Sequence, residues 1–243
     1  MSTTNTPAGS PGTSTTSTAT TSTPDASTGS TGTGTTTPAR RGSIRASGSL
    51  FGWRTVDLLT VAFLGAAFGI AYWGWGLAYG GPADLLGKAF PPLQGITAAP
   101  WLMAGVVGGL VIRRPGAALL CEVIAALVSM LPGTQWGAST LVSGILQGAG
   151  AEIAFLLLGY GAFGLGAAAL AGALSAPLEA VYEWQVYWTD WGMDYKLLYG
   201  AILTVSGAVI AGGLGWLLTR ALAKAGALGA FPVGQEVRET RAV

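Results

Sequence analysis

Residues 93–131 read LQGITAAPWLMAGVVGGLVIRRPGAALLCEVIAALVSML, and this stretch decides the fold class. It contains two apolar segments, 93–112 and 115–131, separated only by Arg113-Arg114. An α-helix needs about 20 mostly apolar residues to cross a hydrocarbon core of about 30 Å. Proline is well placed in the first turn of a helix, so Pro115 marks the start of the second segment. The pattern predicts two membrane-spanning helices joined by a short basic turn.

Four further apolar stretches of similar length flank this pair. They are 56–79, 138–160, 162–183 and 197–222. Only 9% of the 243 residues are charged, against roughly 25% in an ordinary soluble domain, and the mean hydropathy is +0.53. We therefore expect an all-α, multi-pass protein of the cell membrane with six transmembrane helices. The composition excludes a soluble globular enzyme.

Basic residues predict the orientation of these helices, because the cytoplasmic loops of membrane proteins are enriched in Lys and Arg. With six spans, ten basic residues fall on one side of the membrane, and only Lys88 and Lys196 fall on the other. The ten are Arg40, Arg41, Arg45, Arg54, Arg113, Arg114, Arg220, Lys224, Arg238 and Arg241. This asymmetry predicts that both termini are cytoplasmic.

The N-terminal part of the chain has a different composition. Residues 1–38 contain 16 Thr and 7 Ser, and none of Trp, Tyr, Phe, Leu, Ile and Val. Such a segment cannot bury enough apolar surface to offset its conformational entropy, so we expect it to be disordered. A plain linker is favoured over a glycosylated stalk. The expected division is a disordered cytoplasmic tail (1–50), a six-helix membrane domain (51–225) and a cytoplasmic C-terminal tail (226–243).

The chain has few of the groups that catalysis or metal binding requires. It has no His and a single cysteine, Cys121, so no disulfide and no common metal-ligand spacing occurs in its sequence. A net charge of +1 gives no support for binding to nucleic acid. No Walker-type glycine loop with lysine is present. We expect no catalytic residues, no metal and no cofactor, and we favour transport or binding as the class of function.

Carboxylates inside the predicted helices are the strongest functional candidates, because an ionised group within the bilayer is costly. Glu122 lies near the middle of the third predicted span, and Glu152 lies in the inner half of the fourth. Gly144, Gly148 and Glu152 recur at every fourth residue, so Glu152 shares a helix face with two glycines and should pack against protein. The alternative for each is a hydrogen-bonded glutamate with a purely structural role.

A second pair of carboxylates lies near the outer end of the fifth predicted span. Glu179 and Glu183 are four residues apart and share a helix face, close to Trp184, Trp188 and Trp191. Carboxylates beside several indoles suit an organic cation, through charge pairing and attraction to the ring faces. The aromatic residues could instead form an interfacial belt. However, most of them lie on the outer side, whereas a belt should occupy both faces.

These motifs resemble those of the YkoE-like substrate-binding (S) components of energy-coupling factor (ECF) vitamin transporters. The matching residues are Trp101, Arg113-Arg114-Pro115-Gly116-Ala117-Ala118, Glu122, Trp136-Gly137 and Gly144-x-x-Gln147-Gly148-x-Gly150-x-Glu152. The resemblance covers roughly residues 53–225 and excludes the N-terminal tail. It implies a six-helix membrane protein with cytoplasmic termini that binds a vitamin on the outer side.

The resemblance also implies partners and site residues. S components associate with a transmembrane coupling (T) protein and two ABC ATPases, and YkoE-like members are associated with thiamine or its hydroxymethylpyrimidine moiety. The family pattern marks Ala62 and Ala66 as candidates for contact with the coupling protein. The expected substrate site has polar anchors and stacking rings, namely Glu122, Gln147, Glu152, Trp101 and Trp136.

Two other classes of function remain as alternatives. A stand-alone secondary transporter or channel for a small organic cation would usually contain internal repeats, and comparison of the first three spans with the last three reveals no convincing repeat. An intramembrane enzyme would need an assembled catalytic set, which the sequence does not offer.

Overall fold

The computed structural model describes residues 43–241, so residues 1–42 and 242–243, and with them most of the predicted Thr/Ser-rich tail, lie outside the described part of the chain. The described residues belong to one compact unit. Helices are the only regular secondary structure between residues 43 and 241. The predicted all-α fold class is therefore confirmed.

The α-helices are α1 (Thr55–Ala78), α2 (Gly80–Ala89), α3 (Gly95–Ala98), α4 (Met103–Ile112), α5 (Ala117–Met130), α6 (Ser139–Leu157), α7 (Leu165–Val186), α8 (Met193–Ser206), α9 (Gly215–Lys224) and α10 (Pro232–Arg241). Two 3-10 segments, η1 (Pro91–Gln94) and η2 (Ala99–Leu102), lie before α4. A π-helical segment, η3 (Gly207–Leu214), joins α8 to α9.

Five helical stretches in the described residues are long and apolar enough to cross a membrane. They are Thr55–Ala78, Pro91–Ile112, Ser139–Leu157, Leu165–Val186 and Met193–Lys224, and each coincides with a predicted span. The remaining predicted span, 115–131, corresponds to the shorter apolar helix α5. Gly116, with φ of 86°, precedes α5, and Pro132-Gly133 follows soon after its end, so α5 cannot be extended in either direction. A count of six spans stays a prediction.

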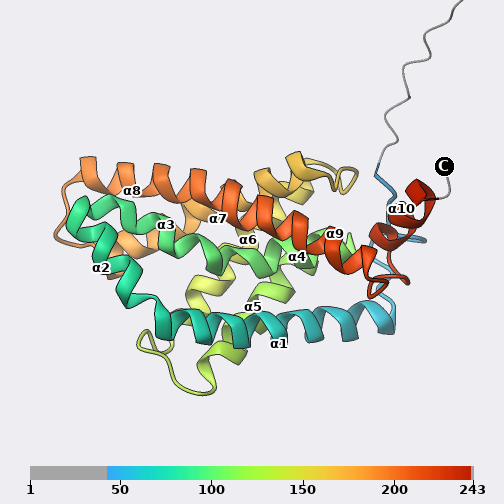
Figure 1. Cartoon of the computed structure of the whole chain (residues 1–243), viewed down its shortest axis with the longest axis horizontal. Helices are drawn as coiled ribbons and strands as arrows, with labels where there is room; N and C mark the ends of the chain where they lie inside the picture. The colour runs from blue at the N-terminus through green and yellow to red at the C-terminus, as the bar shows by residue number, and fades with distance from the viewer. Residues whose placement is uncertain (1–42, 242–243) are drawn as a thin grey trace, which may run out of the picture. The chain divides into compact units, whose positions relative to one another are not determined.

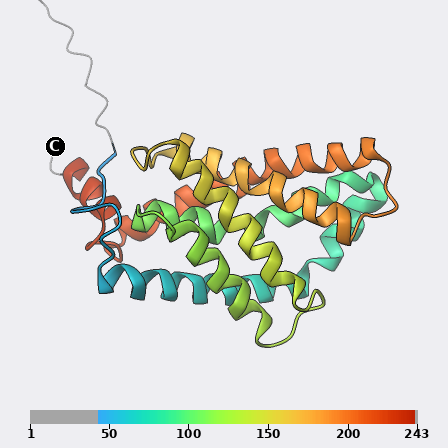
Figure 2. The ribbon, with the colours of Figure 1, turned by 180° about the vertical axis from the view of Figure 1, so that it is seen from behind.

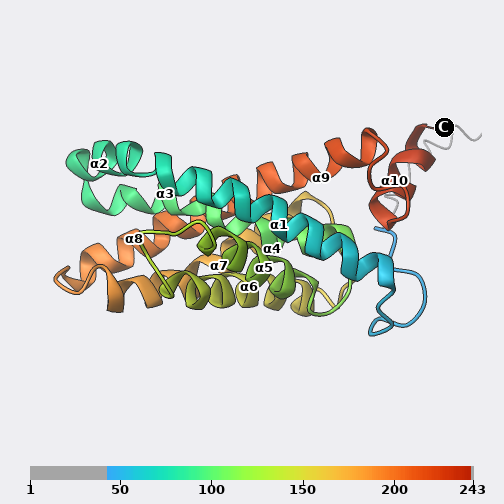
Figure 3. The same ribbon diagram turned by 90° about the horizontal axis from the view of Figure 1, so that it is seen from below.

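Helices α5, α6 and α7 pack side by side with α6 in the middle, and α1 packs against α5 (Figures 2 and 3). Small residues permit these close approaches, as they commonly do between membrane helices. A Cβ atom added at Gly65 of α1 would lie 2.7 Å from Ile124 Cβ, and one at Gly69 would lie 2.5 Å from Val128 Cβ. Buried helix α4 contacts α1, α5, α6 and α9 and forms much of the core.

Two buried arginines form ion pairs at one end of the described unit, where residues 43–54 and α10 lie (Figure 1). Arg113 and Arg114 are each only 1% exposed. Arg114 Nε donates to Asp57 Oδ2 at 2.8 Å, and Arg113 Nη1 donates to Glu236 Oε1 at 2.5 Å. These pairs join the α4–α5 turn to the start of α1 and to α10.

Residues 43–50 contact the same two arginines, although the sequence assigns them to the N-terminal tail. Arg114 donates to the carbonyls of Ser49 and Ser47 at 2.6 and 2.9 Å, and Arg113 donates to the carbonyl of Ile44. The two segments that the sequence places in tails, residues 43–50 and α10, therefore contact the membrane domain. At the opposite end lie α2 and the loop between α7 and α8 (Figure 1).

Candidate functional site

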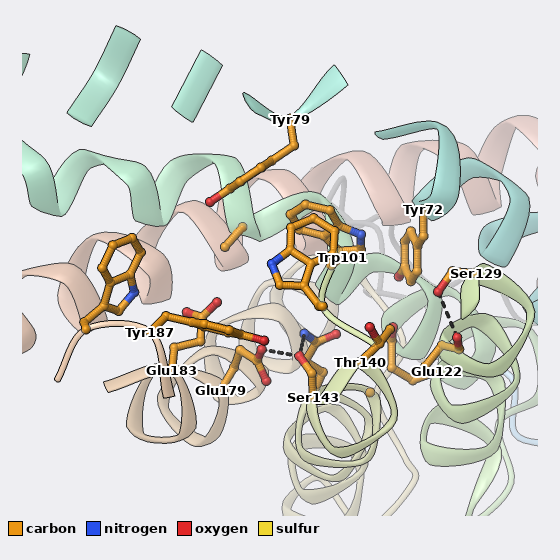
Figure 4. Close-up of a pocket in the computed structure, with 16 residues that line it drawn as sticks. Tyr72, Tyr79, Trp101, Glu122, Ser129, Thr140, Ser143, Glu179, Glu183 and Tyr187 are labelled. Carbon is orange, nitrogen blue, oxygen red and sulfur yellow. Dashed lines mark hydrogen bonds between the residues drawn. The ribbon is translucent and has the colours of Figure 1, made fainter. Parts of the chain in front are cut away.

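A pocket opens between α1, η2, α5, α6 and α7. Its empty space, counted together with the part that is open to solvent, is about 710 Å³. Figure 4 shows the side chains that line it, with glutamates on both sides of Ser143 and aromatic rings above them. The pocket therefore combines acidic and aromatic groups within the membrane-spanning part of the fold.

Glu122 reaches the pocket from α5 and is 1% exposed. Its Oε2 accepts a hydrogen bond from the backbone N–H of Gly105 at 2.6 Å. Gly105 on α4 and Gly148 on α6 make room for this side chain. A Cβ atom added at Gly105 would lie 3.2 Å from Glu122 Oε2, and a Cβ atom added at Gly148 would lie 2.9 Å from Glu122 Cβ. The hydroxyl of Tyr72 on α1 also interacts with this carboxylate, whereas Oε1 makes no hydrogen bond of normal geometry within residues 43–241.

Glu179 reaches the pocket from α7 and is 3% exposed. The hydroxyl of Ser143 on α6 donates to its Oε1, and Ser143 Oγ in turn accepts from Gln147 Nε2 at 2.8 Å. Its Oε2 has no partner in the part of the chain that the structure describes. One turn further along α7, Glu183 accepts a hydrogen bond from the hydroxyl of Tyr199.

Unpartnered polar atoms are concentrated in this pocket. Buried polar groups in folded proteins almost always have a hydrogen-bond partner. In the described residues, five buried side-chain N or O atoms have none, and four of these belong to the pocket residues Glu122, Thr140, Glu179 and Trp188. The charged side chains that line the pocket are three carboxylates, with neither Lys nor Arg among them. The arrangement can accept hydrogen bonds from a ligand and neutralise a positive charge.

Aromatic rings complete the pocket walls. Trp101 and Trp136 form a T-shaped pair with ring centroids 5.1 Å apart, and Tyr79 lies 5.2 and 5.6 Å from them. Trp188 stacks on Trp191 with centroids 4.3 Å apart. Such rings offer faces for a flat heterocycle or an organic cation.

The structure brings together four of the five predicted substrate-site residues. Glu122, Gln147, Trp101 and Trp136 all line the pocket. Their proximity is a fact of the fold, whereas their contact with a substrate stays a prediction.

Glu152, the fifth predicted substrate-site residue, does not line this pocket, and its contact with a substrate stays a prediction. Its Oε2 accepts from the backbone N–H groups of Ala118 and Leu119 at 3.0 and 3.3 Å, and its Oε1 accepts from Gly116 N–H at 2.7 Å and from the Tyr160 hydroxyl. These N–H groups form the start of α5, where a carboxylate is favoured by unpaired donors and the helix dipole. The face of α6 that carries Gly144, Gly148 and Glu152 packs against protein, as predicted. At Glu152, the protein that it meets is the N-terminus of α5.

The sequence indicates Glu179 and Glu183 as a separate cation site and places Ser143 on a polar helix face with Gln147, but it gives no sign of Thr140 as a pocket residue. The fold brings both glutamates into the pocket that contains Glu122. One signal was available, because Ser143 and Gln147 lie four residues apart and so share a face of α6.

The candidate partner residues lie on α1. Ala62 is exposed and Ala66 is half-buried. The neighbouring side chains Leu59 and Phe63 are 66% and 81% exposed, so this surface of α1 is apolar and uncovered in the isolated chain.

Comparisons with known proteins agree on the family. Residues 56–178 match the family model described as the permease component of an ABC-type cobalt transport system. The putative HMP/thiamine permease protein YkoE of Bacillus subtilis (strain 168) is 32% identical over 191 residues, which cover 78% of this chain and 94% of that relative.

A solved structure, described as the crystal structure of an S-component of an ECF transporter, superposes with a TM-score of 0.72. It is 30% identical in sequence, and the match covers 79% of this chain and 96% of that one. Together with the apolar helices, these matches show a multi-pass protein of the cell membrane. The chain belongs to the S components of ECF transporters, the substrate-binding subunits of these importers.

Proposed function

We propose that the pocket binds thiamine or its hydroxymethylpyrimidine moiety from the outer side of the membrane. The observation that carries this proposal is the set of unpartnered polar atoms on Glu122, Thr140, Glu179 and Trp188 around one acidic, aromatic cavity. Thiamine joins a permanently cationic thiazolium to a flat aminopyrimidine. The carboxylates match the positive charge and the amino group, and the indoles match the ring faces. The name of the B. subtilis relative points to the same ligands.

The chain acts in this proposal without catalysis of its own, as the subunit that captures the vitamin. A transmembrane coupling protein and two ABC ATPases supply the energy. The end that carries Arg113, Arg114, Arg220 and Arg238 faces the cytoplasm, because Lys and Arg are retained on that side. Both termini are then cytoplasmic, and α5 completes a set of six spans.

Ligand binding by the purified protein tests the substrate. Three of the nine tryptophans, Trp101, Trp136 and Trp188, line the pocket, and stacking of thiamine should quench their fluorescence in a saturable way. Glu122→Gln should weaken binding, whereas Glu239→Gln, on α10, provides a matched control with unchanged affinity. If neither thiamine nor hydroxymethylpyrimidine changes the fluorescence or the melting temperature at micromolar concentrations, the substrate assignment fails.

Copurification tests the partners. Ala62→Trp should reduce recovery of the chain with a coupling protein and its ATPases, because a large ring would hold the two surfaces apart. Ala201→Trp, at an exposed position on α8, serves as the control for the added ring. Uptake of thiamine into liposomes by this chain alone, driven by an ion gradient, would contradict the proposal and favour a stand-alone transporter.

A further inference from the structure

A second cavity lies at the end of the described unit where α9 meets α10 (Figure 1). Its walls come from residues 43–44, the end of α4, the loop between α6 and α7, α9 and α10. Its charged and aromatic lining side chains are Arg113, Phe163, Trp216, Arg220, Glu236 and Glu239. This cavity shares no lining residue with the candidate vitamin pocket, so the proposed function does not account for it.

Two of the four charged side chains neutralise each other. Arg113 donates to both carboxylate oxygens of Glu236, at 2.5 Å from Nη1 and 3.1 Å from Nη2. The same guanidinium donates to the carbonyls of Leu110 and Ile44, and its Cζ lies 4.6 Å from the ring centroid of Phe163. Because Arg113 is only 1% exposed, this ion pair belongs to the folded structure and leaves little for a ligand to contact.

Arg220 and Glu239 are not neutralised in this way. Nη1 of Arg220 lies 3.6 Å from Glu236 Oε2, which is longer than a normal hydrogen bond, and Glu236 is already held by Arg113. The Arg220 guanidinium also lies 5.6 Å from the ring centroid of Trp216. Glu239 is exposed and forms no ion pair within residues 43–241. The cavity therefore presents one positive and one negative group that are not paired with each other.

The cavity lies where two membrane-spanning stretches end. Gly164 directly precedes α7, and Arg220 lies near the end of α9. Arginine and tryptophan at such positions are typical of the headgroup region of a bilayer. Leu165, next to Gly164, and Leu217, three residues before Arg220, are 51% and 55% exposed. Apolar surface thus continues from the cavity toward the hydrocarbon region, which on the proposed orientation belongs to the cytoplasmic leaflet.

We propose that this cavity binds the headgroup of a zwitterionic phospholipid of the phosphatidylethanolamine class, with its phosphate on Arg220 and its ammonium on Glu239. A guanidinium presents donors in a planar fork that matches phosphate oxygens. Cavities with basic side chains between membrane helices are common sites for lipid headgroups. The acyl chains lie against Leu165 and Leu217. A headgroup with net negative charge fits less well, because Glu239 repels it.

Thermal melting of the full-length protein in detergent tests this site. Phosphatidylethanolamine, phosphatidylglycerol and phosphatidylcholine with identical acyl chains are added separately. A ligand at 100 times its dissociation constant should raise the melting temperature by roughly 5–11 °C for a domain of 150–250 residues. We expect a shift of this size with phosphatidylethanolamine and less than half of it with either other lipid at the same concentration.

Water-soluble probes distinguish a lipid from a free phosphate group. Glycerophosphoethanolamine and inorganic phosphate carry the polar groups but lack acyl chains, so they cannot contact Leu165 and Leu217. At the concentration that saturates the lipid effect, neither should change the melting temperature. Native mass spectrometry of the same samples counts the lipid molecules that the protein retains.

Variants assign the two charges. Arg220→Gln should abolish the shift with phosphatidylethanolamine, because the cation that holds the phosphate is gone. Glu239→Gln should remove the preference for phosphatidylethanolamine over phosphatidylglycerol, because it removes both the ammonium partner and the repulsion. Arg238→Gln, at an exposed position of α10 outside the cavity, is the matched control and should keep the wild-type shift. Each shift is measured against the same variant without lipid, so a lower starting stability does not imitate loss of binding.

Three results would overturn the inference. If Arg220→Gln keeps the shift, or if Arg238→Gln loses it equally, the lipid binds elsewhere. If phosphatidylglycerol stabilises wild-type protein as strongly as phosphatidylethanolamine, Glu239 does not select the headgroup. If inorganic phosphate alone reproduces the shift, the site holds a free anion rather than a lipid. None of these measurements involves thiamine, so failure here leaves the proposed function intact.

Discussion

Glu152→Gln should destabilise the protein and leave its ligand affinity unchanged. The side chain accepts three backbone N–H groups at the start of α5 and the hydroxyl of Tyr160, and it does not line the pocket. Glutamine keeps one acceptor oxygen but replaces the other with an NH₂ group that faces N–H donors. The variant also removes a negative charge from the positive end of the α5 helix dipole.

The expected cost follows from these contacts. A hydrogen bond to a charged group contributes about 1.5–3 kcal/mol, and a carboxylate at a helix N-terminus contributes about 0.3–2 kcal/mol. Loss of the Oε2 contacts with Ala118 and Leu119 together with the charge should cost at least about 3 kcal/mol. For a domain of 150–250 residues, 3 kcal/mol corresponds to a decrease of roughly 6–12 °C in melting temperature.

The assay compares Glu152→Gln with Glu122→Gln in detergent. Thermal unfolding is followed by circular dichroism, and thiamine affinity is measured well below both transitions, so that only folded protein is titrated. We expect Glu152→Gln to lower the melting temperature at wild-type affinity, and Glu122→Gln to lose affinity. An unchanged melting temperature with lost thiamine binding in Glu152→Gln would refute the assignment of Glu152 to the helix terminus.

Three further measurements concern an ion pair at one end of the unit, a helix interface and the N-terminal tail. Burial raises the pKa of Glu236, but the hydrogen bond and charge of Arg113 outweigh it and hold this pKa below the usual 4.5. The Arg113–Glu236 pair should therefore stabilise the fold above pH 4.5, and this stabilisation should be lost as the pH falls through the lowered pKa of Glu236. In Glu236→Gln, the melting temperature should not show this loss on acidification. Gly212→Ala should lower the melting temperature, because the added Cβ would meet the backbone of α7, whereas Gly213→Ala, where a Cβ meets open space, should not. Deletion of residues 2–42 should leave both melting temperature and uptake unchanged, and a loss of either would show that the tail contributes.

Much of the fold could be predicted from hydropathy, because an apolar run of about 20 residues has few alternatives to a membrane-spanning helix. The internal irregularities could not. The stretch Pro91–Ile112 is divided into η1, α3, η2 and α4, and prolines without an N–H lie within both 3-10 segments. The sixth predicted span contains η3, where Gly207 and Gly212 face the backbone of α7. Such features depend on neighbouring helices rather than on local composition.

The site was harder to predict than the fold, because periodicity identifies a helix face but gives no information about what lies opposite each turn. Gly148 and Glu152 share one face of α6. At Gly148 that face meets Glu122, while one turn later, at Glu152, it meets the start of α5. The convergence of Glu122 and Glu179 required knowing that α5 and α7 flank α6, and this order is not encoded in any single segment.

The buried and half-buried carboxylates differ in how completely they are satisfied, and on the proposed function this difference distinguishes structural residues from ligand-binding ones. Asp57 pairs with Arg114, and both oxygens of Glu152 accept from backbone N–H groups. Glu122 and Glu179 each keep an oxygen without a partner among the described residues. An unsatisfied buried acceptor costs about 1–3 kcal/mol, so these two positions lower the stability of the ligand-free protein. A ligand that donates to both would recover this free energy on binding.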